Sequence, residues 1–331
     1  MMARSSVHPS VLVTGGAGFI GSNLVDYLLE KNCEITVLDN FTTSIVNQFP
    51  ENVNVIDGSI EDLETCKKAA TNCDIVFHLA AVSRVGLSED NISLCSSTNI
   101  IGTQNMLIAS VDNNIKKFVY SGSSSYYGNQ KTPHVENMDS QFLNFYSLSK
   151  ATGEKLCEFF NNKYGLETII LRYFNVYGPR LPKDSPYGLV IGNFLSRKKE
   201  GKSLIVHGDG NQRRDFVHVH DVAEANFIAG QSNIKFGIYN IGSGNNHSIN
   251  DLARMFKTKI EFSGRRPGDS DITLADIAHA RKELGWIPKI TLQEGIAKLI
   301  DGIWLLMNSN FVFFDKKRPF AYTILFSFLF S

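Results

Sequence analysis

The sequence Val11-Leu-Val-Thr-Gly-Gly-Ala-Gly-Phe-Ile-Gly-Ser22 joins a short apolar run to a glycine-rich turn and then to an amphipathic segment. Gly15, Gly18 and Gly21 have the spacing G-x-x-G-x-x-G. Glycine permits a tight turn and a close approach of the backbone to a pyrophosphate, and the N-terminus of a following helix offers N–H groups and a positive dipole. The pattern predicts a dinucleotide-binding turn between a strand and a helix. An ordinary glycine-rich turn is the alternative.

A carboxylate after the next apolar run indicates which dinucleotide is bound. Asp39 ends the run at residues 35–38, about 20 residues beyond the glycines. At the end of a strand it can accept hydrogen bonds from both ribose hydroxyls, and it would repel a 2′-phosphate. We therefore expect NAD rather than NADP. The alternative is that Asp39 merely opens the loop at residues 40–44.

Short β-branched runs alternate with helical patterns through the first half of the chain, which predicts an α/β fold with a doubly wound parallel sheet of the Rossmann type. The predicted strands are residues 11–14, 35–38, 53–56, 75–79, 118–121 and 168–171, and the predicted helices are residues 22–31, 62–71, 100–113 and 149–163. Prolines and glycines interrupt the pattern after residue 175, and we expect strands at residues 215–219 and 238–242 to rejoin the sheet. The predicted domains are an NAD-binding domain at residues 8–174 completed by about 215–242, a smaller discontinuous substrate-binding domain at 175–214 and 243–307, and an extra hydrophobic tail at 308–331.

The composition excludes several classes of protein. Lys plus Arg and Asp plus Glu both number 33 in 331 residues, so no basic excess points to nucleic acid. The five scattered cysteines form no metal-binding spacing and are expected to be reduced thiols, and the first ten residues have no apolar signal-peptide core. The final apolar run at residues 321–331 is shorter than the roughly 20 residues that span a bilayer. We expect a cytoplasmic protein without a metal site or a transmembrane span.

A tyrosine and a lysine with the spacing Tyr-x-x-x-Lys are the candidate catalytic pair. Tyr146 and Lys150 lie one helical turn apart, so the ammonium can approach the phenol. A nearby cation stabilises the phenolate and makes the tyrosine a better general base at neutral pH. Ser123, Ser124 and Ser125 follow a predicted strand and can donate hydrogen bonds to a substrate oxygen. The alternatives are a surface pair on one helix face and a strand end with self-capping serines.

Several separated motifs together resemble the extended short-chain dehydrogenase/reductase family, and within it most closely the UDP-sugar 4-epimerases. The resemblance runs from Val11 to about Met307. Its motifs are His78-Leu-Ala-Ala81, Asn99-Ile-Ile-Gly-Thr103, Tyr146-Ser-Leu-Ser-Lys150, Leu171-Arg-Tyr-Phe-Asn-Val-Tyr-Gly-Pro-Arg180, Gly208-Asp-Gly-Asn-Gln-Arg-Arg-Asp-Phe216 and Arg266-Pro-Gly-Asp269.

The resemblance implies two sets of binding residues in addition to the catalytic Ser123, Tyr146 and Lys150. The residues implied for NAD are Gly15, Gly18, Phe19, Ile20, Gly21, Asp39, Asn40, Ser59, Ile60, Leu79, Ala80, Ala81, Ser83, Asn99, Ser121, Tyr146, Lys150, Tyr173 and Phe174. Those implied for the UDP-sugar are Ser123, Asn175, Leu189, Val190, His207, Arg214, Arg266, Asp269 and Thr273. Ser59 departs from the family, which usually has Asp at this position, so a weaker contact with the adenine is expected.

The residues after Ser123 separate the reactions known in the family. Related 4,6-dehydratases follow this serine with an Asp-Glu pair, because elimination of water needs an acid and a base, and related decarboxylases keep a Glu at the second position. This chain has Ser124 and Ser125 there. We therefore expect inversion at C4 through a transient 4-keto sugar. A keto-sugar reductase, a dehydratase and a non-catalytic sensor of NAD or a nucleotide sugar are the alternatives. We also expect a homodimer.

The size of one side chain bears on the sugar. Thr273 stands seven positions after Arg266, where the family places the residue that walls the pocket beside C2. A small residue leaves room for an acetamido group, which predicts UDP-N-acetylglucosamine and UDP-N-acetylgalactosamine as substrates beside UDP-glucose and UDP-galactose. Leu189 argues the other way, because some relatives that prefer acetamido sugars have a smaller residue there.

Overall fold

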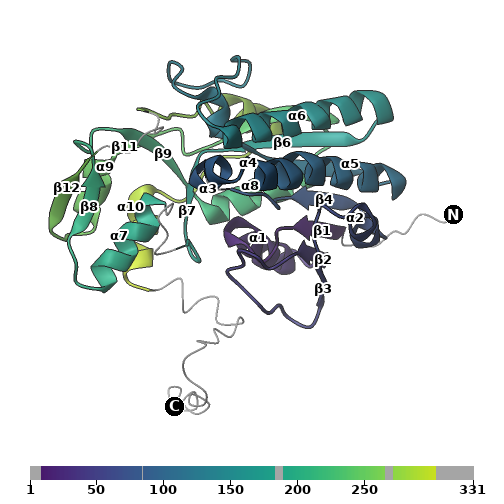
Figure 1. Ribbon diagram of the computed structural model, residues 1–331, viewed down its shortest axis with the longest axis horizontal. Helices are drawn as coiled ribbons and strands as arrows, with labels where there is room; N and C mark the ends of the chain where they lie inside the picture. Colours follow the sequence, from purple (N-terminus) through teal and green to yellow (C-terminus); the bar gives the residue numbers. More distant parts are fainter. Residues whose placement is uncertain (1–8, 84, 183–188, 265–270, 303–331) are drawn as a thin grey trace, which may run out of the picture.

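The computed structural model describes residues 9–83, 85–182, 189–264 and 271–302 (Figure 1). Arg266, Asp269 and the tail at residues 308–331, which the sequence analysis singled out, lie outside the described residues. Among the described residues, no helix combines the length and the apolar character needed to cross a membrane.

A seven-stranded parallel sheet forms the centre of the molecule, which confirms the predicted Rossmann-type fold. Its strands run in the order β10-β6-β5-β4-β1-β2-β3. Their bounds are β1 (Ser10–Thr14), β2 (Glu34–Asp39), β3 (Val53–Asp57), β4 (Ile75–His78), β5 (Lys117–Ser123), β6 (Glu167–Tyr173) and β10 (Phe236–Ile241). The strand order reverses between β1 and β4, and the crevice at such a switch point is the usual ligand site of this architecture.

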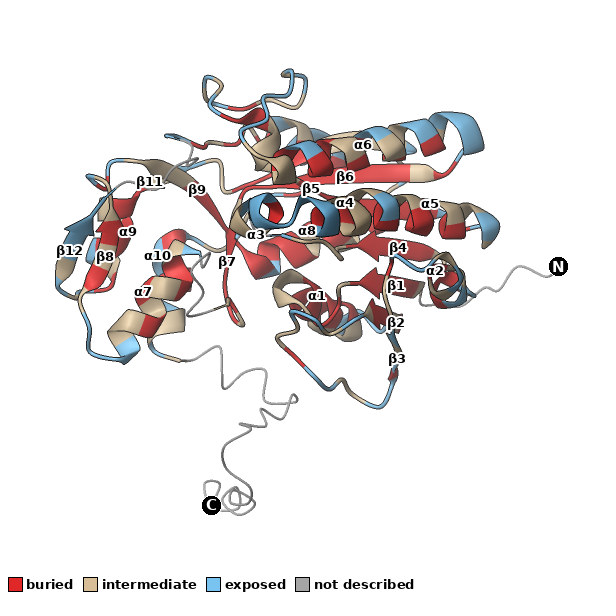
Figure 2. Ribbon diagram, in the orientation of Figure 1, coloured by how far each residue is buried: buried red, intermediate tan, exposed pale blue. Residues whose placement is uncertain are grey.

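Helices cover both faces of the central sheet, and two apolar clusters fill the space between them (Figure 2). The helices α1 (Phe19–Glu30) and α8 (Val219–Gln231) pack on one face. The helices α2 (Leu63–Ala70), α5 (Thr103–Asp112) and α6 (Phe145–Tyr164) pack on the other, together with the short α3 (Val85–Asp90), α4 (Ile92–Ser96) and a π-helical turn, η1 (Ser97–Gly102). The inner strands β1, β4, β5 and β6 are buried along most of their length, as expected for a parallel sheet, whereas the edge strand β3 is mostly exposed.

Helix α6 begins four residues before the predicted start, because a cap decides its first residue. Asn144 accepts a hydrogen bond from the Ser147 amide at 2.9 Å, and the Ser147 side chain in turn bonds the Asn144 backbone. This capping box stabilises the first turn, in which Tyr146 lies. The helix ends at Tyr164 and is capped by Gly165, whose φ of 72° suits a residue without a side chain.

The remaining elements lie to one side of the central sheet and surround a third apolar cluster (Figure 1). A three-stranded sheet has the order β11-β9-β7, with β7 (Asn175–Tyr177), β9 (Arg213–His218) and β11 (Asn246–Ser248). A parallel pair consists of β8 (Leu204–His207) and β12 (Ile260–Ser263). Helices α7 (Val190–Lys199), α9 (Ile249–Met255) and α10 (Leu292–Ile300) pack around them, whereas a further π-helical turn, η3 (Ala280–Leu284), packs on β10 of the central sheet.

One of the two late strands rejoins the central sheet, and the other does not. The prediction for residues 238–242 is confirmed, because β10 pairs with β6 along its whole length. The prediction that residues 215–219 rejoin the same sheet is wrong, because β9 pairs with β7 and β11 instead. The reason is that β10 already occupies the free edge of β6, which leaves β9 no partner there.

Candidate active site

The glycine-rich turn after β1 is closely packed on its neighbours. Gly15 has a φ of +69°, and a Cβ there would lie 2.7 Å from the Ala80 amide nitrogen. A Cβ on Gly21 would lie 2.1 Å from the Gly15 carbonyl oxygen, so helix α1 can pack against the turn only with glycine at this position. Gly18 is the N-cap of α1 and has no side chain to cap it. The amides of Phe19 and Ile20 in the first helical turn therefore face the crevice without a side-chain cap.

Asp39, at the end of β2, is held beside this turn. Its Oδ2 accepts from the Ala17 amide at 2.9 Å and its Oδ1 from the Phe41 amide at 2.8 Å. A carboxylate has about four acceptor positions, so each oxygen retains one. The geometry therefore leaves Asp39 able to bind a pair of hydroxyls.

Three predicted contacts lie further along the same edge of the sheet. The exposed Asn40 accepts from the Thr42 amide at 3.2 Å, and Ser59 Oγ accepts from the Glu61 amide at 3.1 Å. Ile60 is buried against Gly102. The first two side chains shape local turns, and Ile60 belongs to the core.

The loop after β4 forms the other wall of the crevice. Thr14 Oγ1 accepts from the amides of Leu79 and Ala80, both at 3.2 Å. The buried Asn99 accepts from the Val82 amide at 2.8 Å and donates to Ser149 Oγ on α6 at 2.9 Å. Asn99 thus fixes the segment that carries Ala81 and Ser83, and its oxygen and its nitrogen are both already hydrogen-bonded to protein.

The ends of β5 and β6 place two aromatic residues below the crevice. Ser121 Oγ lies 3.2 Å from the Tyr173 hydroxyl, which donates to Asn226 at 2.9 Å. Burial raises the pKa of Tyr173 to about 12, so this phenol stays neutral at physiological pH. Phe174 is buried and stacks on Tyr127.

Ser123 and Tyr146 are brought together, although they are 23 residues apart in the sequence. Tyr146 is half-buried in the first turn of α6. Burial raises its pKa, and a hydrogen bond with the Ser123 side chain opposes this rise. Ser123 Oγ also accepts from the amide of Ser125 at 3.2 Å and from its hydroxyl at 2.9 Å.

Lys150 lies one turn further along α6 and is buried. Its Nζ is 4.5 Å from the centroid of the Tyr120 ring, and the Tyr120 hydroxyl donates to the Lys150 carbonyl oxygen at 3.2 Å. Burial lowers the pKa of Lys150 to about 8, and the negative charge of Glu154 opposes this fall. The groups that surround the Lys150 ammonium are thus Tyr120 and Glu154, and the charge relation that the sequence analysis expected between Lys150 and Tyr146 is not among the causes that shift the pKa of either group.

The sequence analysis missed these groups and the arginine that holds Glu154. Arg172 binds Glu154 bidentately, with Nη2–Oε2 at 2.7 Å and Nε–Oε1 at 3.0 Å. Both side chains are almost fully buried. The spacing of Lys150 and Glu154, four residues apart on one helix, was the available signal for Glu154. No pattern in the sequence around Tyr120 identifies it as a neighbour of Lys150.

On the substrate side, Asn175 and Thr273 are in contact. The Asn175 amide donates to Thr273 Oγ1 at 3.1 Å and to the Asp215 carbonyl oxygen at 3.0 Å. Thr273 is buried, and its Oγ1 also accepts from the Asp215 amide at 3.1 Å. The buried Asp215 carboxylate in turn holds the backbone amides of Ser243 and Ala275 at 2.6 and 3.0 Å. Asp215 therefore holds the backbone at Ser243 and Ala275 beside Asn175 and Thr273, a role that the sequence analysis did not predict.

The other predicted substrate residues are more dispersed. Arg214 Nη1 donates to the carbonyl oxygens of Arg213 and Asp271 at 3.0 and 3.3 Å. His207 ends β8, and its Nδ1 lies 2.7 Å from Ser263 Oγ. Leu189, which is 46% exposed, and Val190 lie at the start of α7.

Comparison with known proteins decides the family. Residues 11–242 match the model of the NAD dependent epimerase/dehydratase family. The chain belongs to this family. It is 38% identical over 309 residues to a Methanocaldococcus jannaschii protein provisionally named a UDP-glucose 4-epimerase, covering 91% of this chain and 99% of that protein. It is 36% identical over 252 residues to the UDP-N-acetyl-alpha-D-glucosaminuronate decarboxylase of Bacillus cytotoxicus, covering 73% and 78%.

A solved structure of the epimerase/dehydratase family has the same fold. The UDP-N-acetylglucosamine 4-epimerase of Methanobrevibacter ruminantium M1, in complex with UDP-N-acetylmuramic acid, superposes with a TM-score of 0.85 at 32% identity, covering 91% of this chain and 99% of that one. NAD, the predicted cofactor, is confirmed by the family. The crevice fits NAD on its own geometry, because the uncapped start of α1 suits a pyrophosphate and Asp39 retains acceptors for ribose hydroxyls.

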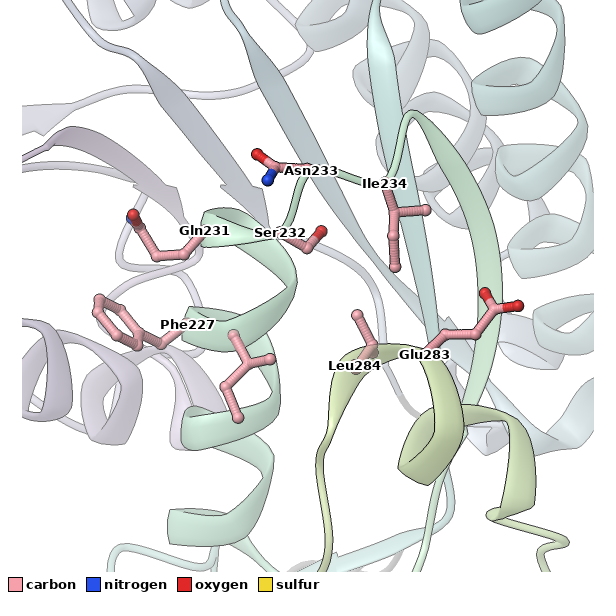
Figure 3. Close-up of a pocket in the computed structure, with 8 residues that line it drawn as sticks. Phe227, Gln231, Ser232, Asn233, Ile234, Glu283 and Leu284 are labelled. Atoms are coloured by element: carbon pink, nitrogen blue, oxygen red, sulfur yellow. The ribbon is translucent and has the colours of Figure 1, made fainter.

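A separate hollow of about 460 Å³ lies elsewhere on this epimerase/dehydratase fold (Figure 3). It is lined by Phe227, Ile228, Gln231, Ser232, Asn233, Ile234, Glu283 and Leu284, which include none of the predicted site residues. Ile234 lies two residues before β10, so the hollow opens at the amino ends of the parallel strands, opposite the edge that carries Asp39 and Ser123. We assign it no part in the chemistry.

Proposed function

We propose that the protein inverts the configuration at C4 of a UDP-sugar through a transient 4-keto sugar. The contact between Ser123 and Tyr146, at the edge of the sheet where the glycine-rich turn and Asp39 also lie, is the observation that supports this reaction most directly. Ser124 and Ser125 supply no carboxylate for dehydration or decarboxylation, which favours epimerisation among the reactions of the family.

In the proposed mechanism, Tyr146 in its phenolate form accepts the proton of the C4 hydroxyl. Ser123 donates a hydrogen bond that stabilises this phenolate, and Lys150 adds a buried positive charge one turn away. When bound, NAD supplies reversible redox chemistry at C4. After the keto sugar has turned its other face to the site, Tyr146 returns the proton to the C4 oxygen.

We propose that the two parts of the fold divide the binding. The NAD-binding domain comprises residues 8–174 and, since β9 belongs to the smaller sheet, about 219–242, and its contacts are those named in the sequence analysis. The substrate-binding domain comprises residues 175–218 and 243–307. Within it, Asn175, Arg214 and His207 are proposed to hold the UDP-sugar, together with Arg266 and Asp269.

The proposed substrates include N-acetylated sugars. The small side chain of Thr273 beside Asn175 supports this choice, and the related M. ruminantium enzyme is a UDP-N-acetylglucosamine 4-epimerase. We therefore propose UDP-N-acetylglucosamine and UDP-N-acetylgalactosamine, together with UDP-glucose and UDP-galactose, as interconverting pairs.

The reaction can be tested by NMR of the sugar anomeric protons. The purified protein, incubated with each of the four UDP-sugars, should produce the C4 epimer without net formation of NADH, and the Tyr146→Phe variant should retain bound NAD but lose turnover. UDP-glucuronate in a parallel incubation tests the alternative. Release of carbon dioxide from it, with no epimer from any hexose, would replace epimerisation by decarboxylation.

We also propose a cytoplasmic homodimer. All five cysteines are free and buried, which suits a reducing compartment. Ile92, Leu94, Ile101 and Leu148 are exposed on α4, η1 and α6, which pack against one another, and a second copy would cover them. Light scattering of the parent should give twice the chain mass, and Leu148→Glu should shift the protein toward the monomer.

A further inference from the structure

The hydroxyl of Ser123 is surrounded by donors. Ser123 caps the short helical turn Ser124–Tyr127, and its Oγ accepts from the Ser125 amide at 3.2 Å. The Ser125 hydroxyl donates to the same oxygen at 2.9 Å. A hydroxyl oxygen has two acceptor positions, so both positions of Ser123 are filled by one neighbour.

Only the proton of Ser123 then remains for another partner. The partner that the chain offers is Tyr146, because the Ser123 side chain lowers the pKa of its phenol. Because the lone pairs of Ser123 already accept from Ser125, Ser123 is the donor in this contact. A donor to the phenol oxygen favours its ionised form, which agrees with the direction of the effect on the pKa of Tyr146.

We propose that Ser125 is a positioning residue that fixes Ser123 as a one-way hydrogen-bond donor, so that Tyr146 takes the C4 proton from the sugar directly and not through Ser123. A relay through Ser123 would need a free lone pair on its oxygen to accept the sugar proton while its own proton passes on. The two bonds from Ser125 occupy those lone pairs. This inference rests on the proposed epimerase function.

The proton and electron balance of the step is simple. The C4 O–H bond breaks as the O–H bond of Tyr146 forms, and Ser123 keeps its own proton throughout. NAD, held by the glycine-rich turn and Asp39, would supply the reversible two-electron chemistry at C4 that balances the loss and return of this proton. The Tyr146 O–H bond then breaks as the C4 O–H bond re-forms.

Two substitutions of Ser125 separate the effect of its hydroxyl donor from that of its backbone amide donor. Ser125→Ala removes the hydroxyl donor and keeps the amide donor, while Ser125→Thr keeps both. Loss of one hydrogen bond predicts a fall in kcat of roughly three- to tenfold for Ser125→Ala, with little change in KM. Ser125→Thr should restore kcat. In a Ser123→Ala background, Ser125→Ala should cost nothing further, because its effect passes through Ser123.

Tyr146 itself provides a readout that does not depend on turnover. With tyrosine labelled at Cζ with ¹³C, and with Tyr146→Phe to identify the signal, the midpoint of Tyr146 ionisation should rise in Ser125→Ala and not in Ser125→Thr. Direct proton transfer also predicts that Ser123→Ala keeps more turnover than Tyr146→Phe.

Three results decide between the possibilities. An unchanged Tyr146 midpoint in Ser125→Ala, or a Ser123→Ala variant as inactive as Tyr146→Phe, would overturn the inference even if the parent interconverts C4 epimers. A raised midpoint in a protein that turns over no UDP-sugar would instead refute the proposed function and leave the positioning of Ser123 supported.

Discussion

Replacing the buried Lys150 by methionine should stabilise the protein while it removes activity. Lys150 is 5% exposed, and burial lowers its pKa from 10.5 to about 8. At about 1.4 kcal/mol for each pKa unit, keeping this side chain charged at pH 7 costs about 3 kcal/mol of folding stability. Methionine fills a similar space without charge but loses the contact with the Tyr120 ring, which at about 1 kcal/mol leaves a net gain of about 2 kcal/mol.

The gain should depend on pH in a defined direction. The pKa of Lys150 in the folded protein, about 8, lies below the unfolded value of 10.5. Below pH 8 both the folded and the unfolded parent hold the proton of Lys150. The full cost of the buried charge is then present, and the difference in folding stability between Lys150→Met and the parent is largest. As the pH rises from 8 towards 10.5, the folded parent releases the proton before the unfolded chain does, so the parent gains stability and the difference disappears.

Urea unfolding of the NAD-free proteins at a series of pH values measures this effect, because bound cofactor would add its own stabilisation. The control is Lys155→Met on the same helix, where the side chain is 76% exposed and pairs with Glu158 at 2.8 Å. An exposed pair contributes little, so this variant should stay within about 0.5 kcal/mol of the parent. A Lys150→Met protein that is less stable than the parent at pH 7 would refute the reasoning.

Three further substitutions test the structure. Gly15→Ala forces a side chain into a left-handed residue and against Ala80, so it should lower both the melting temperature and the NAD content measured after denaturation. Arg172→Met leaves Glu154 buried without its partner and should cost about 3–5 kcal/mol in urea unfolding, and a loss below 1 kcal/mol would show that the pair is dispensable. Thr273→Val keeps the volume but removes the acceptor of Asn175, so KM for every UDP-sugar should rise severalfold with the NAD content unchanged; an effect confined to N-acetylated sugars would contradict this.

The parts of the fold that could be predicted from the sequence depend on local patterns. The glycine spacing and the apolar runs identified the turn, the strand that ends at Asp39 and the other strands of the central sheet. These features could be predicted because backbone flexibility and the spacing of apolar residues depend only on residues that are close together in the sequence. The start of α6 was placed too late, since the apolar period begins after the capping box of Asn144 and Ser147. The pairing of β9 was missed because it depends on β10 having taken the edge of β6.

The candidate site shows the same division. Tyr146 and Lys150 could be found from their spacing, and Ser123 from its place after a strand. Of the groups around Lys150, Glu154 could have been found from its spacing on α6, but Tyr120 and Arg172 could not, because they lie on two strands, β5 and β6, and reach this site only through the packing of the fold. Sequence spacing thus identifies the reactive side chains, whereas the packing of the folded protein decides which charged side chains lie next to them.

Among the described residues, the chain passes between the strands of the central sheet and those of the smaller sheets at three points, between Tyr173 and Asn175, between His218 and Val219, and between Ile241 and Asn246. No single cut therefore separates the two halves, and neither half corresponds to one continuous stretch of gene. A chimera that grafts the smaller sheets of one relative onto the central sheet of another would need separate inserts with every junction at the end of a strand, where no linker absorbs a mismatch. We expect new sugar preferences in this architecture to come from changes at individual positions and not from exchange of modules.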